Sequence, residues 1–162
     1  MVDTVVKGRY STKLLLRYLC KNIQEVEWLV ILADIREFIK RLAVNEIEHY
    51  YVGKLDSKPE KAVGVYSLKT SGPPVTAIGG ESTYGVIGVS LLIHYNNNAT
   101  ETEIAAKKLY NKLRTVKDVT IKDKQIYMIE LLGPEPVDIG TDDNGIYERV
   151  IEMKIYYERN DI

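Results

Sequence analysis

The chain has 162 residues, enough to bury one hydrophobic core, and its 45% hydrophobic and 28% charged residues exclude a disordered chain. The formal net charge of −1 argues against a general nucleic-acid-binding protein, because such domains are usually strongly basic. Cys20 is the single cysteine, which excludes a disulfide within the chain and is typical of a cytoplasmic protein. The longest uncharged apolar run, Trp28 to Ala33, is too short to cross a bilayer, so we expect no membrane partner.

The N-terminal part of the chain predicts helices. Ser11 can cap a short helix that carries leucines on one side. An apolar stripe from Trp28 to Leu42 then predicts a helix from about Ile23 to Ala43, with Asp34 offering a second start. Such a stripe is usually core, but it can instead be a contact surface between subunits with Trp28 as its anchor.

The chain is organised around one long strand followed by one amphipathic helix. Between Gly85 and Tyr95 alternate positions are almost wholly apolar, which predicts a strand with one face against a core. Residues 96–98 are three asparagines that end the strand. Thr100 and Glu103 predict a capping box for a helix that reaches Leu113 and packs on the strand.

Further strands are expected on both sides of this unit. They are Ile47 to Val52, Ala62 to Leu68, Val119 to Ile121, Gln125 to Leu132 and Ile146 to Glu158. Glycine and proline predict irregular loops at residues 69–82 and 133–145, and Asn144-Gly145 is a strong hairpin signal. The fold class is therefore α+β: an antiparallel or mixed sheet of about four to five strands with a long helix packed on it and an N-terminal helical extension.

The sequence carries no catalytic motif, and we expect no catalytic residue, cofactor or metal. Gly79-Gly80 lacks the lysine of a phosphate-binding loop, and the acids around Asn144 are out of register for a calcium loop. His49 and His94 have no cysteine or histidine nearby in sequence, so each is by default a surface or core residue. A small cytoplasmic ligand-binding or enzyme domain that uses His49 or His94 stays open as an alternative.

Charge is unevenly distributed along the chain. Residues 1–21 carry five basic side chains against one acid, and residues 131–148 carry five acids and no basic side chain. Opposite charges at separate places suit head-to-tail contacts between copies, although each can simply be a solvated surface. Twelve tyrosines against one phenylalanine suit surfaces that an assembly covers, and equally suit ordinary sheet faces.

An ordered set of features runs from Asp34 onward. A helix and a tyrosine-bearing strand lead to Val-Gly-Val-Tyr at residues 63–66, a Gly-Pro-Pro and Gly-Gly loop, Ala-Ala-x-x-Leu-Tyr-x-x-Leu at residues 105–113, and a closing segment at residues 133–148. This order resembles the phage tail-terminator family, often labelled phage minor capsid proteins and found also in prophages and phage-tail-like bacteriocins. The resemblance covers about four-fifths of the chain, and it divides the chain into an N-terminal helical extension, residues 1–33, and a tail-terminator-like α+β domain, residues 34–162.

The resemblance implies a structural protein and no enzyme. Its ring, usually of six copies, would cap the head-proximal end of a tail tube and end polymerisation of tube and sheath. Implied partners are further copies of the chain, the tail tube protein, and a sheath protein or head–tail connector, with no specific nucleic acid. Such a protein would be assembled in the bacterial host cytoplasm into a virion tail or a contractile, headless particle (a contractile injection system). A head–tail completion or joining protein is the alternative within the same class.

Candidate interface residues come from the apolar stripe and the two irregular loops, because long loops on a rigid sheet usually carry binding. They are Trp28, Gly72, Pro73, Pro74, Gly79, Gly80, Glu135, Asp138, Asp142 and Asp143. Loops that merely connect strands are the alternative.

Overall fold

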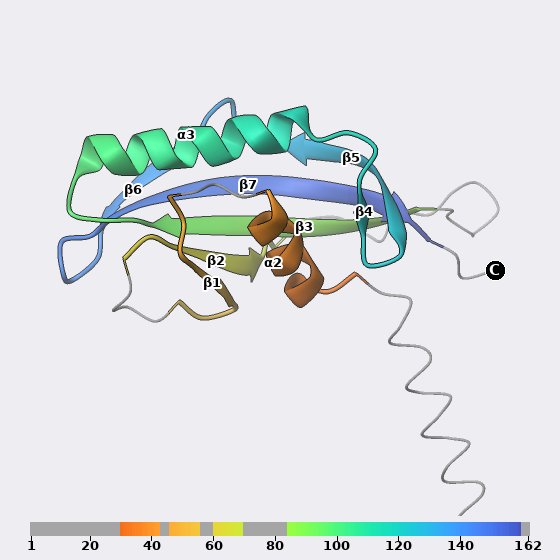
Figure 1. The fold of residues 1–162 in the computed structure, drawn as a ribbon, viewed down its shortest axis with the longest axis horizontal. Helices are drawn as coiled ribbons and strands as arrows, with labels where there is room; N and C mark the ends of the chain where they lie inside the picture. The colour runs from red at the N-terminus through yellow and green to blue at the C-terminus, as the bar shows by residue number, and fades with distance from the viewer. Residues whose placement is uncertain (1–29, 43–45, 56–59, 70–83, 160–162) are drawn as a thin grey trace, which may run out of the picture.

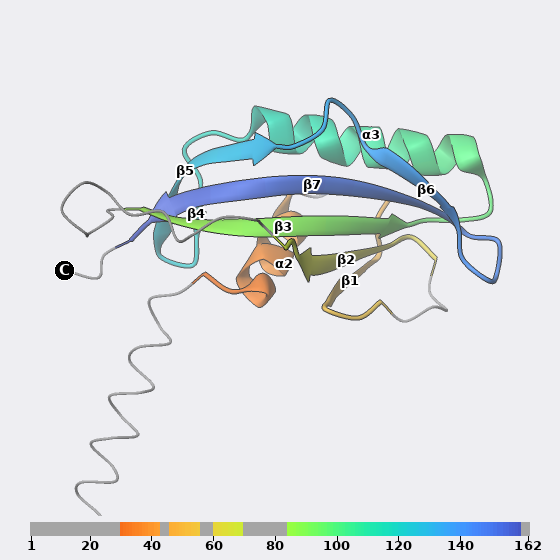
Figure 2. The same ribbon diagram turned by 180° about the vertical axis from the view of Figure 1, so that it is seen from behind.

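The computed structural model describes residues 30–42, 46–55, 60–69 and 84–159. The elements in these ranges are helices α2 (Leu32–Arg41) and α3 (Ala99–Thr115) and strands β1 (His49–Val52), β2 (Ala62–Ser67), β3 (Tyr84–His94), β4 (Thr120–Ile121), β5 (Lys124–Leu131), β6 (Val137–Thr141) and β7 (Tyr147–Glu158). Both helices lie on the same side of one curled sheet, and α3 runs along β7 and β3 (Figure 1; seen from behind in Figure 2). No helix among the described residues covers the opposite face of the sheet.

β7 is the central strand of the sheet. One of its edges pairs antiparallel with β3, and the other is shared by β6, on its N-terminal half, and β5, on its C-terminal half. β2 pairs antiparallel with β3, and β1 pairs parallel with β2. β1 is therefore one edge of the sheet, and β4, β5 and β6 together form the other.

The hydrophobic core lies between the sheet and the two helices. Alternate residues of β3 and β7 face it, as in the cross-strand pair Leu91 and Ile151, both at most 2% exposed. Phe38 of α2 and Leu109 of α3 pack into the same cluster. The strand-then-helix unit predicted from the alternating pattern is confirmed, because burial of one face leaves a period of two in a strand and of 3.6 in a helix.

The start of α3 differs from the prediction. Its N-cap is Asn98, whose Oδ1 accepts hydrogen bonds from the amides of Thr100 at 3.0 Å and Glu101 at 3.2 Å. Thr100 is thus inside the first turn, and Glu103 pairs with Lys107 one turn later at 2.5 Å. The capping box was placed two residues too late because asparagine and threonine are both strong N-caps.

α2 begins at Leu32, where the Asp34 carboxylate accepts a hydrogen bond from the Ile31 amide at 3.0 Å. The helix therefore begins near the second start that the sequence offered, but its N-cap is Ile31 and Asp34 lies in its first turn. The part of the predicted helix before residue 30, and with it nearly all of the N-terminal extension predicted for residues 1–33, lies outside the described residues.

The sheet has seven strands in the described residues, and the prediction of four to five was too low. β6 was missed because it lies in residues 133–145, which were predicted to be an irregular loop. All five residues of β6 are exposed, so burial leaves no alternating pattern, and its pairing with β7 holds it in place. The predicted hairpin turn at Asn144-Gly145 is confirmed: it joins β6 to β7, and Gly145 has a φ of +77°.

Candidate assembly surface

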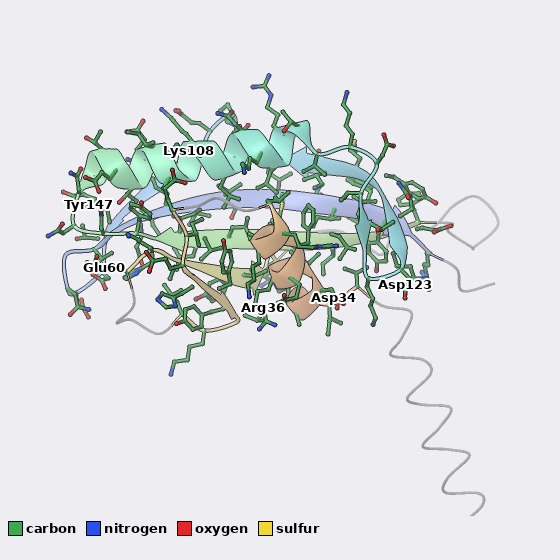
Figure 3. All side chains as sticks on the ribbon, in the orientation of Figure 1. Asp34, Arg36, Glu60, Lys108, Asp123 and Tyr147 are labelled. Atoms are coloured by element: carbon green, nitrogen blue, oxygen red, sulfur yellow. The ribbon has the colours of Figure 1, made fainter. Side chains whose placement is uncertain are left out.

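The structure gathers four of the predicted interface residues at one edge of the sheet. Glu135 precedes β6, Asp138 lies in it, and Asp142 and Asp143 form the turn between β6 and β7. Tyr147, the first residue of β7, marks this end of the molecule in Figure 3, and Asp123 marks the opposite end. The remaining candidates lie outside the described residues: Trp28, Gly72, Pro73, Pro74, Gly79 and Gly80.

An open groove of about 410 Å³ lies between α3 and the segment that leads into β6. It is lined by Glu103 and Lys107 of α3, by residues 134–138 and by Arg149 of β7. Arg149 is 15% exposed, and its Nη2 lies 3.0 Å from Oδ2 of Asp138 and 3.8 Å from Oε2 of Glu103. This guanidinium ties β6 to both β7 and α3.

The second cation of the groove, Lys107, completes the network. Its Nζ lies 2.5 Å from Oε1 of Glu103 and 3.8 Å from Oε2 of Glu135. The hydrogen bond from Lys107 lowers the pKa of Glu103 and raises the pKa of Lys107. Glu135, 68% exposed, is the acid that the network holds most loosely, so it is the groove residue with most charge available to a partner.

Asp142 organises the turn between β6 and β7. Its Oδ1 accepts hydrogen bonds from the amides of Ile146 at 2.8 Å and Asn144 at 2.9 Å. Its Oδ2 contacts Nε2 of His94 at 3.1 Å. These contacts, with the Ile146 amide contributing most, hold the pKa of Asp142 at about 2. Asp142 therefore has a structural role, whereas its neighbour Asp143 is exposed.

The two histidines lie in different environments. His94 is 1% exposed and pairs across the sheet with Glu148, whose pKa is raised by burial. His49 is exposed on β1, with its ring 6.4 Å from that of Tyr51. Neither lines the groove beside α3. Among the described residues, no three His, Cys, Asp or Glu side chains are grouped so that they could hold a metal ion.

Exposed apolar side chains at the same edge were not predicted from the sequence. They are Tyr127, Met128, Leu132, Val137 and Ile139, each between 41% and 56% exposed. Val137-Asp138-Ile139, between Pro136 and Gly140, is a short alternating run that could have indicated an edge strand. The edge formed by β5 and β6 thus exposes apolar side chains beside acids, and an apolar centre with a polar rim is the usual arrangement of a protein interface.

The family model for the bacteriophage tail terminator protein matches residues 24–159. The chain belongs to the phage tail terminator family. The matched range contains both helices and all seven strands of the described residues, so the groove, the acidic turn and the β5–β6 edge are parts of the tail-terminator domain. The chain is therefore a structural component of phage tail assembly. No curated protein matches it. Neither helix in the described residues is long and apolar enough to span a membrane.

Proposed function

We propose that this chain forms a ring on the head-proximal end of a phage or phage-tail-like tail tube and ends polymerisation of the tube and of any sheath. The observation that carries the proposal is the family match, which spans residues 24–159. The chain acts by binding and not by catalysis, and its partners are further copies, the tube protein, and a sheath protein or a head–tail connector. It assembles in the cytoplasm of the bacterial host.

The physical basis is the end of a polymer. A stacked tube leaves surface and strand edges at its growing end, and these recruit the next ring. A subunit that fits this end and offers a different face above it stops growth. A closed ring also needs two different, complementary patches on each subunit. The acidic β5–β6 edge and the oppositely placed β1 edge supply two such patches.

The test is electron microscopy of particles from cells that lack this chain, with the chain supplied in trans as the control. Overlong or ragged tubes of variable length are expected. Tubes of normal, uniform length beside unjoined heads would assign the chain to head–tail joining instead. Particles that are unchanged in every respect would reject an assembly role.

A further inference from the structure

We propose that neighbouring copies of this chain join by continuing one β-sheet across their contact, with the β6 edge of one copy adding to the β1 edge of the next. This inference rests on the proposed ring, and it names the two surfaces that close it. The partner is a second copy of the chain.

β6 is an edge strand that is open to further pairing. Among the described residues it pairs with β7 alone, and all five of its residues are exposed. Ile139 lies at a register shift between Asp138 and Gly140, has no partner residue in β7, and is 51% exposed. Such an edge presents backbone donors and acceptors to another strand. The charge that normally protects an edge is neutralised here, because Arg149 lies 3.0 Å from Asp138.

β1 is the matching edge on the other side of the sheet. It pairs with β2 alone in the described part of the chain, and it has four residues against the five of β6. His49 and Val52 are exposed at its two ends, and the tyrosines between them are half-buried. The two edges therefore have similar length, and both carry apolar or aromatic side chains.

One apolar row connects the two edges across the uncovered face of the sheet. Residues that are cross-strand partners lie on the same face of a sheet. The strand register places one row of partners side by side from β6 to β1: Val137, Val150, Leu92, Gly64 and Tyr51. This face carries no helix among the described residues (Figure 2). Placing β6 beside β1 of the next copy brings Val137 to the Tyr51 end of the neighbouring row. The row then continues from copy to copy.

Charge favours pairing of β6 with β1 over pairing of two β6 edges. Residues 130–148 contain six acids and no lysine or arginine. The acids are Glu130, Glu135, Asp138, Asp142, Asp143 and Glu148. Two β6 edges would repel each other through the exposed acids Glu135 and Asp143. On the β1 side, Lys40 of α2 and Lys54 after β1 are exposed cations without an ion pair among the described residues. A contact between unlike patches closes into a ring, whereas a contact between like patches stops at a dimer.

A contact of four or five residues is small, so an isolated pair of copies is weak. In a closed ring every copy makes the contact twice, and opening the ring breaks one contact without releasing a subunit. We therefore expect monomer and closed ring in solution, with few open intermediates.

The direct test is disulfide cross-linking between two single-cysteine forms of the full chain, both carrying Cys20→Ser. Ile139→Cys and His49→Cys place the thiol on β6 and β1, at positions that face each other when Val137 lies beside Tyr51, and Ile104→Cys, 49% exposed on α3, is the control. Under mild oxidation the mixture of the β6 and β1 forms should give covalent dimer, and each form alone or mixed with the control should give little. Dimer from Ile139→Cys alone would show pairing of like edges and overturn the proposal.

The second test places a charge on the β6 edge and measures the mass of the assembly by native mass spectrometry and sedimentation. Ile139→Lys should shift the ring to monomer, whereas Ile104→Lys should leave it intact, with unchanged melting curves for both. A monomeric wild-type chain, or equal ring fractions in the two variants, would overturn strand pairing. Tube length in complemented cells separates this proposal from the proposed function. If the Ile139→Lys chain still caps tubes, the β6–β1 contact is overturned and the capping function stands. If cells that lack the chain make tubes of normal length, the capping function itself is overturned.

Discussion

Nε2 of His94 lies 3.1 Å from Oδ2 of Asp142, and this contact ties the end of β3 to the turn that joins β6 and β7. The histidine is buried, and the aspartate also accepts hydrogen bonds from the amides of Asn144 and Ile146. The acidic turn is therefore anchored to the centre of the sheet. The position of Asp143, the exposed acid beside it, depends on this anchor.

Asp142→Ala is expected to destabilise the domain. The change removes the carboxylate that accepts hydrogen bonds from the amides of Asn144 and Ile146 and leaves the buried ring of His94 without this partner, so Tm should fall by several degrees in thermal denaturation. Asp143→Ala is the matched control, since it removes an exposed carboxylate from the same turn. Equal Tm values for the two variants would contradict the structural role of Asp142.

The stability that Asp142 provides should depend on pH in a defined window. Its pKa is about 2 in the folded chain against an ordinary value of 3.8, so the folded state favours the charged form. The contribution is fully present above the ordinary value and is lost as pH falls through the folded pKa. Denaturant unfolding of wild type and Asp142→Asn should give a constant difference in free energy above about pH 4, and the difference should shrink between about pH 4 and pH 2. If the difference in free energy of unfolding between the two chains does not change with pH in this range, the stabilising role of the Asp142 charge is contradicted.

Glu148 should show the opposite sign. Burial raises its pKa above the ordinary value of 4.5, so its charged form destabilises the folded state at neutral pH. Glu148→Gln should therefore be at least as stable as wild type at pH 7, and any gain should disappear once pH falls below about 4.5. Urea unfolding across this range checks the sign, and a variant that is less stable at pH 7 would contradict it.

The contact between Gly85 and Tyr157 predicts the cost of adding one methyl group. These residues are cross-strand partners in β3 and β7, and a Cβ at Gly85 would overlap the ring of Tyr157, which is 8% exposed. Gly85→Ala should lower the free energy of unfolding by about 1–3 kcal/mol because the ring must move. In a Tyr157→Leu background the same change should cost clearly less. Equal costs in both backgrounds would show that the ring is not the cause.

The sequence predicted the parts of the fold in which burial acts on one face. The alternation through β3 and the apolar face of α3 follow from the core that they share, as Leu91 and Leu109 illustrate. β6 has no such pattern, because both of its faces are exposed and its position depends on β7. The contact between His94 and Asp142 joins residues 48 positions apart, and no local pattern carries such a pairing.

Contacts between distant parts of the chain also decided which residues of the candidate site are available to a partner. The sequence identified the acids of residues 133–148 as one patch, and the structure divides them by role. Arg149 neutralises Asp138 and the turn uses Asp142, whereas Glu135 and Asp143 are exposed. Hydrogen bonds made by the surrounding fold decide which charges are left for a partner.

The different roles of these acids decide which of them should be reversed to test the acidic edge as a contact surface. Reversing Asp142 together with Asp143 would break the turn as well as change its charge, so loss of assembly would have two explanations. Glu135→Lys combined with Asp143→Lys reverses the two exposed acids and leaves the anchor of the turn intact. We expect unchanged Tm and association between copies, or with the tube, weakened on the order of tenfold at low salt.

Salt provides the control for this last prediction. Contacts between exposed charges are screened at high ionic strength, so the gap between wild type and the Glu135→Lys, Asp143→Lys chain should narrow as salt is raised. Sedimentation at several salt concentrations measures the gap directly. Asp123→Lys compared with Asp143→Lys alone is the matched pair, because each reverses one exposed acid and Asp123 lies at the opposite end of the molecule (Figure 3). If Asp123→Lys weakens association as much as Asp143→Lys does, net charge and not the acidic edge controls assembly.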